Sequence, residues 1–358
     1  MRLHDNIILK IFDLLSKQNI SKCSLVCQHW HDLTFQTKSW NSLRVATKHY
    51  KEVIYCLSKV LKRTDRTIRI YANNEQHLKY ILQSFVYYDT LYITSKVFFE
   101  NLEMSCLQHI PYYIKSLKLN LDICVDTSMF ERFTNLRQLT LINTLDIMDE
   151  INYDHLPASL EEFKIQSFVK SWVITKPSSI KTLTIHNGIQ LDMSLNFFTS
   201  LEYLNIKDSD IVFSGTCPTL KTLEIDFVRC NTITCFPNIH KYAYRRALET
   251  KHLKTLPTTL ERLLISFITE YPIPPTVCDV EMFSNLRILY IKSYDIGTTY
   301  TASKSLEELY LYDTNVQTVY AKHCDSLMFL YISSCEYTEN PIIYVKPTTY
   351  VGFYEIFI

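Results

Sequence analysis

The feature that most constrains the fold is a spaced triplet of apolar residues that recurs along most of the chain. In each copy a Leu or Ile is followed by an apolar or aromatic residue three positions later and by another two positions after that. The first residues of successive copies are 19 to 26 residues apart, with a mean of 21.3. The eleven copies are Ile114-Leu117-Leu119, Leu136-Leu139-Leu141, Leu160-Phe163-Ile165, Ile180-Leu183-Ile185, Leu201-Leu204-Ile206, Leu220-Leu223-Ile225, Ile239-Tyr242-Tyr244, Leu260-Leu263-Ile265, Leu286-Leu289-Ile291, Leu306-Leu309-Leu311 and Leu327-Leu330-Ile332.

Weaker copies stand on either side of the series, at Asp65-Ile68-Ile70 and Tyr88-Leu91-Ile93 before it and at Val351-Tyr354-Ile356 after it. Prolines indicate where the strands begin, because proline lacks the amide hydrogen of a sheet ladder and is tolerated only at the start of a strand. Six prolines fall two or three residues before the first residue of a copy: Pro111, Pro157, Pro177, Pro218, Pro237 and Pro257. This pattern resembles the leucine-rich repeat, which has a period in the twenties and one short strand per repeat.

Such a repeat predicts where the side chains point. The three residues of a triplet, here called the first, second and third anchors, point into the solenoid, and the strands of successive repeats stack in parallel ~4.8 Å apart. The residues between and just after the anchors then form columns on an exposed concave face. A parallel sheet that is open on one face departs from the usual covering of both faces, and we expect the open face to bind another macromolecule.

The columns of this predicted face change character along the chain. From the copy that begins at Leu260 onward, the position between the second and third anchors becomes apolar and then aromatic. Exposed aromatic clusters are typical of recognition hot spots, because they bury much area at little entropy cost. We predict a target-binding patch of Leu264, Tyr290, Tyr310, Tyr312, Phe329 and Tyr331. The alternative is that the apolar C-terminal tail folds back and covers these residues.

The first 44 residues follow a different, helical pattern. Apolar residues recur there at spacings of three and four, which lines one face of a helix: Ile7, Ile8, Ile11, Phe12, Leu14 and Leu15. Two further helical elements follow, around Cys23 and around Trp30. A segment of about 45 residues rarely buries a sufficient core alone. We therefore expect its apolar surface to be covered by a partner or by the following domain.

Within this segment, Leu3-His4-Asp5-Asn6-Ile7-Ile8-Leu9-Lys10-Ile11-Phe12, followed by Leu25-Val26-Cys27-Gln28-His29-Trp30 and Trp40, resembles the F-box. The one departure is His4, which stands where the family has a proline. The resemblance implies an interface with a Skp-family adaptor, or the small core of the motif, made of Leu3, Ile8, Ile11, Phe12, Leu15, Val26 and Trp30. The alternative role for this segment is a helical cap that seals the end of the solenoid.

An F-box followed by leucine-rich repeats is the arrangement of substrate receptors in SCF-type cullin ubiquitin ligases. The resemblance implies a non-catalytic protein that binds a Skp-family adaptor, and through it a cullin, and holds a protein target on its repeats. The competing function is an interaction scaffold that uses both parts for assembly without ubiquitin transfer.

The two resemblances together predict an α/β fold class. We expect a three-helix F-box at 1–44, a linker with degenerate early repeats at 45–110, and a curved leucine-rich-repeat solenoid with a C-terminal cap at 111–358. The parallel β-sheet is expected on the concave face of that solenoid.

Composition narrows the function classes further. The chain has 37 basic and 37 acidic residues and a formal net charge of zero, which argues against a dedicated nucleic-acid binder. A basic stretch does occur at Lys59, Lys62, Arg63, Arg66 and Arg69, but aromatic residues that could stack on bases do not alternate with these cations.

Four scattered glycines argue against a nucleotide-phosphate loop. No apolar run reaches the ~20 residues of a bilayer span, and 11 cysteines without a secretion signal predict reduced thiols in the cytoplasm or nucleus.

No residue pattern predicts an enzyme, a metal site or a cofactor. A structural zinc site needs four converging ligands, whereas Cys23 and Cys27 fall within the F-box resemblance, where we expect them buried and reduced. Nothing in the sequence marks a cysteine as an activated nucleophile. Two pairs of adjacent carboxylates, Glu161-Glu162 and Glu307-Glu308, lie on strands where neighbouring side chains point to opposite sides. We expect these carboxylates to be solvated or to pair with Lys or Arg of neighbouring repeats.

Overall fold

A computed structural model describes residues 5–15, 17–23, 27, 29–30, 33, 42–46, 67–72, 74–84, 88–95, 104–120, 126–188, 191–226, 229–230, 234–245, 255–266, 282–292, 299–314, 316, 318–334 and 342–353. The chain forms two compact units, Met1–Phe168 and Val169–Ile358, which we call unit 1 and unit 2.

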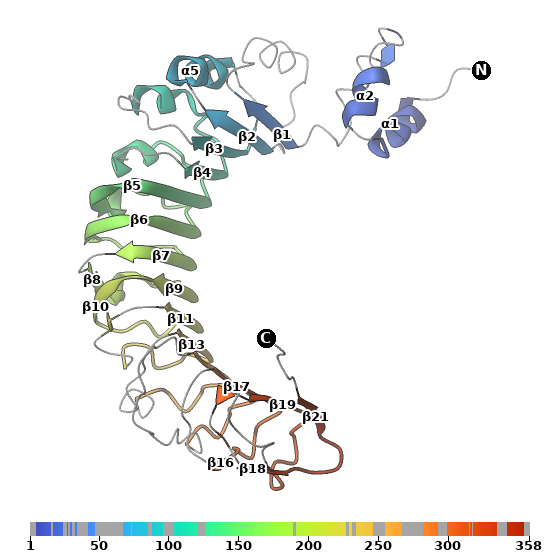
Figure 1. The fold of residues 1–358 in the computed structure, drawn as a ribbon. Helices are drawn as coiled ribbons and strands as arrows, with labels where there is room; N and C mark the ends of the chain where they lie inside the picture. Colours follow the sequence, from blue (N-terminus) through green and yellow to red (C-terminus); the bar gives the residue numbers. More distant parts are fainter. Residues whose placement is uncertain are drawn as a thin grey trace. The chain divides into compact units, whose positions relative to one another are not determined.

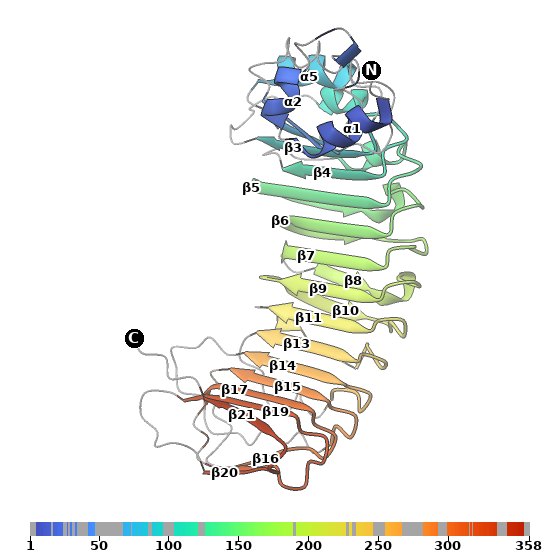
Figure 2. The same cartoon turned by 90° about the vertical axis from the view of Figure 1, so that its right-hand side faces the viewer.

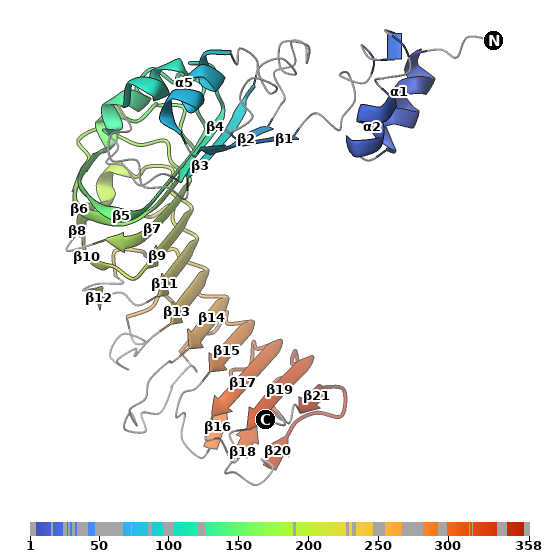
Figure 3. The same ribbon diagram turned by 45° about the horizontal axis from the view of Figure 1, so that its top comes forward.

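Unit 1 begins with two helices and continues as a parallel sheet with short helices between its strands (Figure 1). Its strands lie in the order β1-β2-β3-β4-β5-β6. Helix α5 packs against strand β2 and the 3-10 helix η3, and Figure 3 shows α5 beside the first strands of the sheet. The elements are α1 (Asp5–Asp13), α2 (Lys17–Cys23), β1 (Ser42–Ala46), β2 (Thr67–Ala72), α5 (Glu75–Ser84), β3 (Thr90–Ser95), η3 (Met104–His109), β4 (Ser116–Asn120), η4 (Thr127–Phe130), β5 (Gln138–Asn152), η5 (Tyr153–His155) and β6 (Glu162–Val173), whose last residues belong to unit 2.

Unit 2 has a main sheet in the order β7-β9-β11-β13-β14-β15-β17-β19-β21, with all its strands parallel (Figure 2). Two smaller parallel sheets, β12-β10-β8 and β16-β18-β20, accompany it. The elements are β7 (Thr182–Gly188), β8 (Leu191–Ser194), η6 (Leu195–Phe197), β9 (Tyr203–Lys207), β10 (Asp210–Ser214), β11 (Thr222–Asp226), β12 (Arg229–Cys230), β13 (Lys241–Arg245), β14 (Arg262–Ser266), β15 (Ile288–Lys292), β16 (Thr299–Thr301), β17 (Glu308–Thr314), β18 (Thr318–Tyr320), β19 (Phe329–Ser334), β20 (Ile342–Tyr344) and β21 (Tyr350–Phe353).

The predicted anchors form the core of both units. In β4 and β5, Leu117 lies opposite Leu139, and the third anchors pair in the same way. From β7 to β19 each second anchor again lies opposite the next. Every anchor of the eleven copies is buried, and burial of one such side chain stabilises the fold by roughly 1.5–3 kcal/mol. The chain is therefore a parallel-sheet solenoid of the leucine-rich-repeat type with few helices.

The ladder extends to the weaker early copies. Ile68 of β2 lies opposite Leu91 of β3, and Leu91 lies opposite Leu117. One strand earlier, Leu43 of β1 lies opposite Ile68. Strand β1 begins at Ser42, two residues before residue 44, where we expected the helical segment to end. The domain boundaries at 44 and 110 stay predictions.

The last predicted copy has the wrong register. Val351 lies opposite Leu330 and Phe353 lies opposite Ile332, so Val351 is a second anchor rather than a first one, and Phe353 takes the place expected for Ile356. The error arises because this segment is apolar at almost every position, and a continuous apolar run fits either phase of a period-two strand.

The predicted three-helix count of the N-terminal segment is not confirmed. Two helices, α1 and α2, lie among its described residues. His29, Trp30 and Leu33 have helical backbone, but most of the residues between and around them lie outside the described part of the chain.

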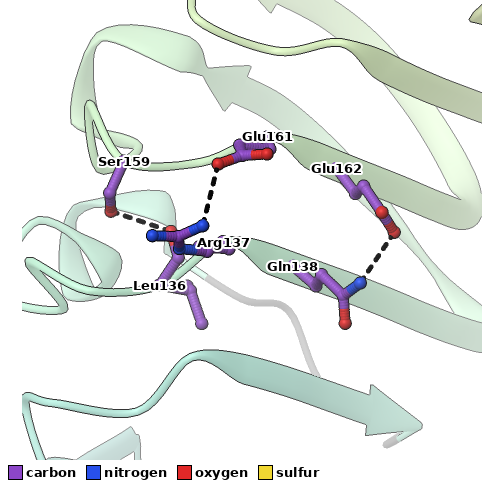
Figure 4. A network of polar contacts seen from close by, with 6 residues as sticks. All are labelled: Leu136, Arg137, Gln138, Ser159, Glu161 and Glu162. Atoms are coloured by element: carbon purple, nitrogen blue, oxygen red, sulfur yellow. Dashed lines mark hydrogen bonds and ion pairs between the residues drawn. The ribbon is translucent and has the colours of Figure 1, made fainter.

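Polar side chains fasten successive turns to one another, as Figure 4 shows between β5 and β6. The Ser159 hydroxyl donates to the backbone oxygen of Leu136 at 2.8 Å, and Thr259 and Ser305 make the equivalent bond to the preceding first anchor. These hydroxyl residues each stand just before a first anchor. They satisfy carbonyl groups that the strands leave unpaired in the turns.

The adjacent carboxylates engage separate partners, and Glu161 and Glu307 pair with an arginine of the preceding repeat as expected, whereas Glu162 and Glu308 accept hydrogen bonds from uncharged groups. Arg137 contacts Glu161 at 3.4 Å, whereas the Gln138 amide donates to Glu162 at 3.1 Å (Figure 4). In unit 2, Glu307 forms an ion pair with Arg287 at 2.7 Å. Its neighbour Glu308 instead accepts a hydrogen bond from a tyrosine.

Candidate protein-binding surfaces

Helix α1 and the turn that follows it carry two adjacent apolar stripes. On the inner stripe Ile8 and Phe12 are buried and Leu15 is half-buried. The outer stripe repeats the same spacing one residue earlier, with Ile7, Ile11 and Leu14 exposed by 48%, 46% and 87%. Ile7 and Ile11 share one face of α1, and Leu14 lies in the turn directly after the helix, where its N–H donates to the backbone oxygen of Ile11 at 3.1 Å. We call these three exposed apolar side chains the exposed α1 stripe.

The inner stripe is held in place by residues that follow α2. The rings of Phe12 and Trp30 meet edge to face, with centroids 5.4 Å apart, and Leu33 completes a buried cluster with Phe12 and Ile8. Asp5 Oδ1 lies 2.8 Å from His29 Nε2, which ties the first turn of α1 to the residue before Trp30. These contacts fix the orientation of α1 and therefore present its other face to solvent.

The predicted adaptor residues thus separate into two groups. Ile8, Phe12, Leu15 and Trp30 belong to the small core or lie against it, and Ile11 is exposed. Leu3 and Val26 lie outside the described residues. The sequence-based set omitted Ile7 and Leu14, although both belong to the apolar pattern of the N-terminal segment.

The two cysteines of this segment are less buried than expected. Cys23 is half-buried and Cys27 is exposed. The Cys27 sulfur accepts a weak hydrogen bond from the backbone N–H of Trp30 at 3.5 Å. Among the residues that the structure describes, no three His, Cys, Asp or Glu side chains gather as a metal site would require.

A second candidate surface lies on unit 2, on the sheet face formed by the residues between the anchors, which we call the open face. The predicted column is in register: Leu264 lies opposite Tyr290, Tyr290 opposite Tyr310, and Tyr310 opposite Tyr331. All four side chains are half-buried. Tyr312 stands in the next column of the same face, opposite Lys292.

The tyrosine rings contact one another and form a continuous cluster. Tyr312 lies between Tyr290 and Tyr331, with centroids 4.9 Å from each. Tyr310 is 6.2 Å from Tyr290 and 6.4 Å from Tyr331. We call these four residues the tyrosine patch. The mutual packing holds the rings in place, which lowers the entropy lost when a partner binds.

The electrostatics of the tyrosine patch favour neutral phenols that donate hydrogen bonds. The Tyr310 hydroxyl donates to Glu308 Oε2 at 3.0 Å. Partial burial raises the pKa of Tyr310, and the bond to Glu308 adds to the effect. Partial burial likewise raises the pKa of Tyr312.

The tyrosine patch is extended by apolar residues of the neighbouring column. Phe329 is exposed by 45% and Tyr350 by 67%, and their rings meet at 6.1 Å. Ile288, half-buried, lies opposite Glu308 in the same column. Sequence reasoning included Phe329 but missed Ile288 and Tyr350, which the spacing of the second anchors would have placed on the same face.

The predicted alternative, a tail that folds back over the patch, does not hold for the described residues of the tail. Tyr350–Phe353 form β21, which continues the main sheet beside β19. Gly352 lies next to Tyr331 in the central column. Residues 354–358 lie outside the described residues.

No helix among the described residues is long and apolar enough to cross a bilayer.

Comparison with known proteins identifies the N-terminal segment. Residues 5–46 match the F-box-like family, so the chain carries an F-box-like domain at its N-terminus. No curated protein matches the chain in sequence.

Among solved structures, a leucine-rich-repeat protein of Leptospira interrogans is 14% identical over 90% of this chain and 92% of its own, with a TM-score of 0.47. The TLR13–ssRNA13 complex is 12% identical over 82% of this chain and 57% of its own, with a TM-score of 0.41. YopM from Yersinia enterocolitica WA-314 is 14% identical over 82% of this chain and 68% of its own, also with a TM-score of 0.41.

Proposed function

We propose that this protein is a non-catalytic substrate-recognition subunit of an SCF-type ubiquitin ligase in the cytoplasm or nucleus. The F-box-like domain binds a Skp-family adaptor, and through it a cullin, while the repeats bind a protein target. Ubiquitin transfer then depends on proximity, because the target is held near a charged enzyme supplied by the rest of the complex.

The observation that carries this proposal is the exposed α1 stripe inside the F-box-like match. Ile7 and Ile11 are large apolar side chains on one face of a short helix, and Leu14 follows them in the turn at its end. Exposed apolar surface of this kind marks protein interaction sites. The inner residues Ile8 and Phe12 support the helix from behind and do not contact the adaptor.

The tyrosine patch supports a target site on unit 2. Tyrosine is enriched among interface hot spots, where it packs an apolar ring and keeps a polar end for hydrogen bonding. The patch and its neighbours Leu264, Ile288 and Phe329 provide that combination on one sheet face.

The receptor role is tested by capturing partners with the full chain and with a variant that lacks residues 1–40, which spares β1. We expect the deletion to lose adaptor and cullin and to retain other partners. If the full chain captures neither adaptor nor cullin, the proposal is wrong. The same deletion distinguishes a receptor from a scaffold. If the protein is a receptor, a retained partner becomes longer-lived in cells that express the deletion variant; if it is a scaffold, the lifetime of that partner does not change.

The target site is tested separately with Tyr310→Ala/Tyr331→Ala. We expect this variant to lose retained partners and to keep the adaptor. If those partners stay bound while Lys164→Glu releases them, the target site lies on unit 1 and not on the tyrosine patch.

A further inference from the structure

The open face of unit 1 has a different character from that of unit 2. Arg69 lies opposite Tyr92, Tyr92 opposite Lys118, and Lys118 opposite Thr140. Lys164 takes the same position in β6, the neighbour of β5. We call these five residues the basic column. Arg69 is exposed and the other four are half-buried.

The cations of the basic column are not neutralised by carboxylates of the described residues. Among the described residues, no carboxylate forms an ion pair with Arg69, Lys118 or Lys164. Cations at the turns do form such pairs: Lys115 contacts Asp89 at 3.3 Å, and Arg137 contacts Glu161 at 3.4 Å. Among the first five residues of each strand from β2 to β6, Glu162 is the one carboxylate. It already accepts a hydrogen bond from Gln138. The chain as a whole is neutral, so this positive surface is a local feature.

Two further features suit the basic column to carboxylates. The Arg69 guanidinium carbon lies 5.1 Å from the centroid of the Tyr92 ring, and stacking of this kind steadies the guanidinium while its N–H edges stay available for a bidentate pair. Hydroxyl groups line the adjacent column at Thr67, Thr90 and Ser116.

We propose that the basic column binds an extended acidic segment of a partner protein that runs across the strands. The cations stand on alternate strands, so they are about 9.6 Å apart along the sheet. A polyproline II segment rises ~3.1 Å per residue, and carboxylates at every third residue therefore repeat at nearly the same distance. This inference does not depend on the proposed ligase role.

A protein segment fits the basic column better than a nucleic acid. Sheets that bind single strands stack successive bases on several exposed aromatic rings. The basic column has one ring, that of Tyr92, and Arg69 lies over it.

The test uses the full chain and a fluorescein-labelled peptide with the sequence Glu-Pro-Pro-Glu-Pro-Pro-Glu, with anisotropy measured at low salt. A peptide with Gln in place of each Glu is the control ligand. We expect the Glu peptide to bind at least about tenfold more tightly than the Gln peptide, and R69E/K118E to abolish that preference.

The matched protein control is K79E/K304E. It changes the net charge by the same amount at two exposed lysines, one on α5 and the other before β17, and we expect it to bind the Glu peptide as the wild type does. If R69E/K118E unfolds at a lower urea concentration than the wild type, R69Q/K118Q replaces it and should still remove most of the preference. Adaptor capture by these variants should be unchanged, which separates this test from that of the ligase role.

Three results would overturn the proposal. One is equal binding of the Glu and Gln peptides, and the second is wild-type binding by both substituted forms of the basic column. The third is tighter binding of an oligothymidylate than of the Glu peptide, lost in R69E/K118E, which would make the basic column a nucleic-acid site.

Discussion

The ring of Tyr331 lies directly against Gly352, its partner across β19 and β21. A β-carbon added to Gly352 would lie 3.3 Å from Tyr331 Cδ2, which is closer than ordinary van der Waals contact. The absence of a side chain at 352 therefore determines where the ring rests, and with it the contact between Tyr331 and Tyr312.

Gly352→Ala should displace the Tyr331 ring and destabilise unit 2, because the added methyl group needs the space that the ring occupies. In a double-mutant cycle with Tyr331→Leu, we expect a coupling free energy of about 0.5–1 kcal/mol, measured by urea unfolding. Strict additivity of the two substitutions would mean that the ring does not rest on the glycine.

Arg132 should stabilise unit 1 more than an arginine that forms one exposed ion pair. Its guanidinium donates to the carbonyl oxygens of Gln108, Leu107 and Ile110 at 2.6, 2.8 and 2.9 Å, which closes the C-terminal end of η3. We expect Arg132→Met to lower the free energy of unfolding by about 1–3 kcal/mol. Arg132→Lys should recover only part of this, because one ammonium group cannot reproduce the planar fork.

The matched control for Arg132 is Arg137→Met. Arg137 forms a single exposed ion pair with Glu161, and such pairs contribute about 0–1 kcal/mol. Equal losses from the two substitutions in urea titrations would contradict the role given to the three carbonyl bonds.

Two buried tyrosines predict a loss of stability at alkaline pH. Burial raises the pKa of Tyr88 and of Tyr153 well above 10.0. Above pH ~10 the unfolded chain releases these protons while the folded chain keeps them. The free energy of unfolding therefore falls as pH rises, by up to about 1.4 kcal/mol per pH unit for each tyrosine.

Phenylalanine at these positions removes the titrating group. We expect Y88F/Y153F to show a shallower fall in stability between pH 10 and 11 than the wild type, measured by urea titration at each pH. Parallel pH profiles would mean that both phenols ionise in the folded protein as they do in water.

The repeat could be predicted from sequence because its signal is redundant. Each second anchor is apolar and lies at a constant offset from the first, so errors in one copy do not shift the others. The prediction failed at Val351, where apolar residues on both faces remove the alternation that fixes the phase.

The smaller sheets were missed for a related reason. Ile211 lies opposite Leu191 and Phe213 opposite Met193, and all four are buried. In β8 and β10 only two side chains of each strand are buried, and a triplet template does not detect them.

The candidate surfaces could be predicted only in part. The column from Leu264 to Tyr331 follows directly from the repeat, since position in the triplet decides the face. The stacking of Arg69 on Tyr92 joins residues 23 positions apart and depends on strand register. Likewise, helical spacing alone grouped Ile8 with Ile11, and only the packing of Phe12 against Trp30 decides which stripe is buried.

The most direct test of the central claim is the affinity of the full chain for a purified Skp-family adaptor, measured by calorimetry. We expect I7E/I11E to weaken binding at least about a hundredfold, because two interface hot spots are lost. K10E changes the net charge of α1 by the same amount at an exposed polar position and should bind as the wild type does. Wild-type affinity in I7E/I11E, with the chain still folded, would contradict the account.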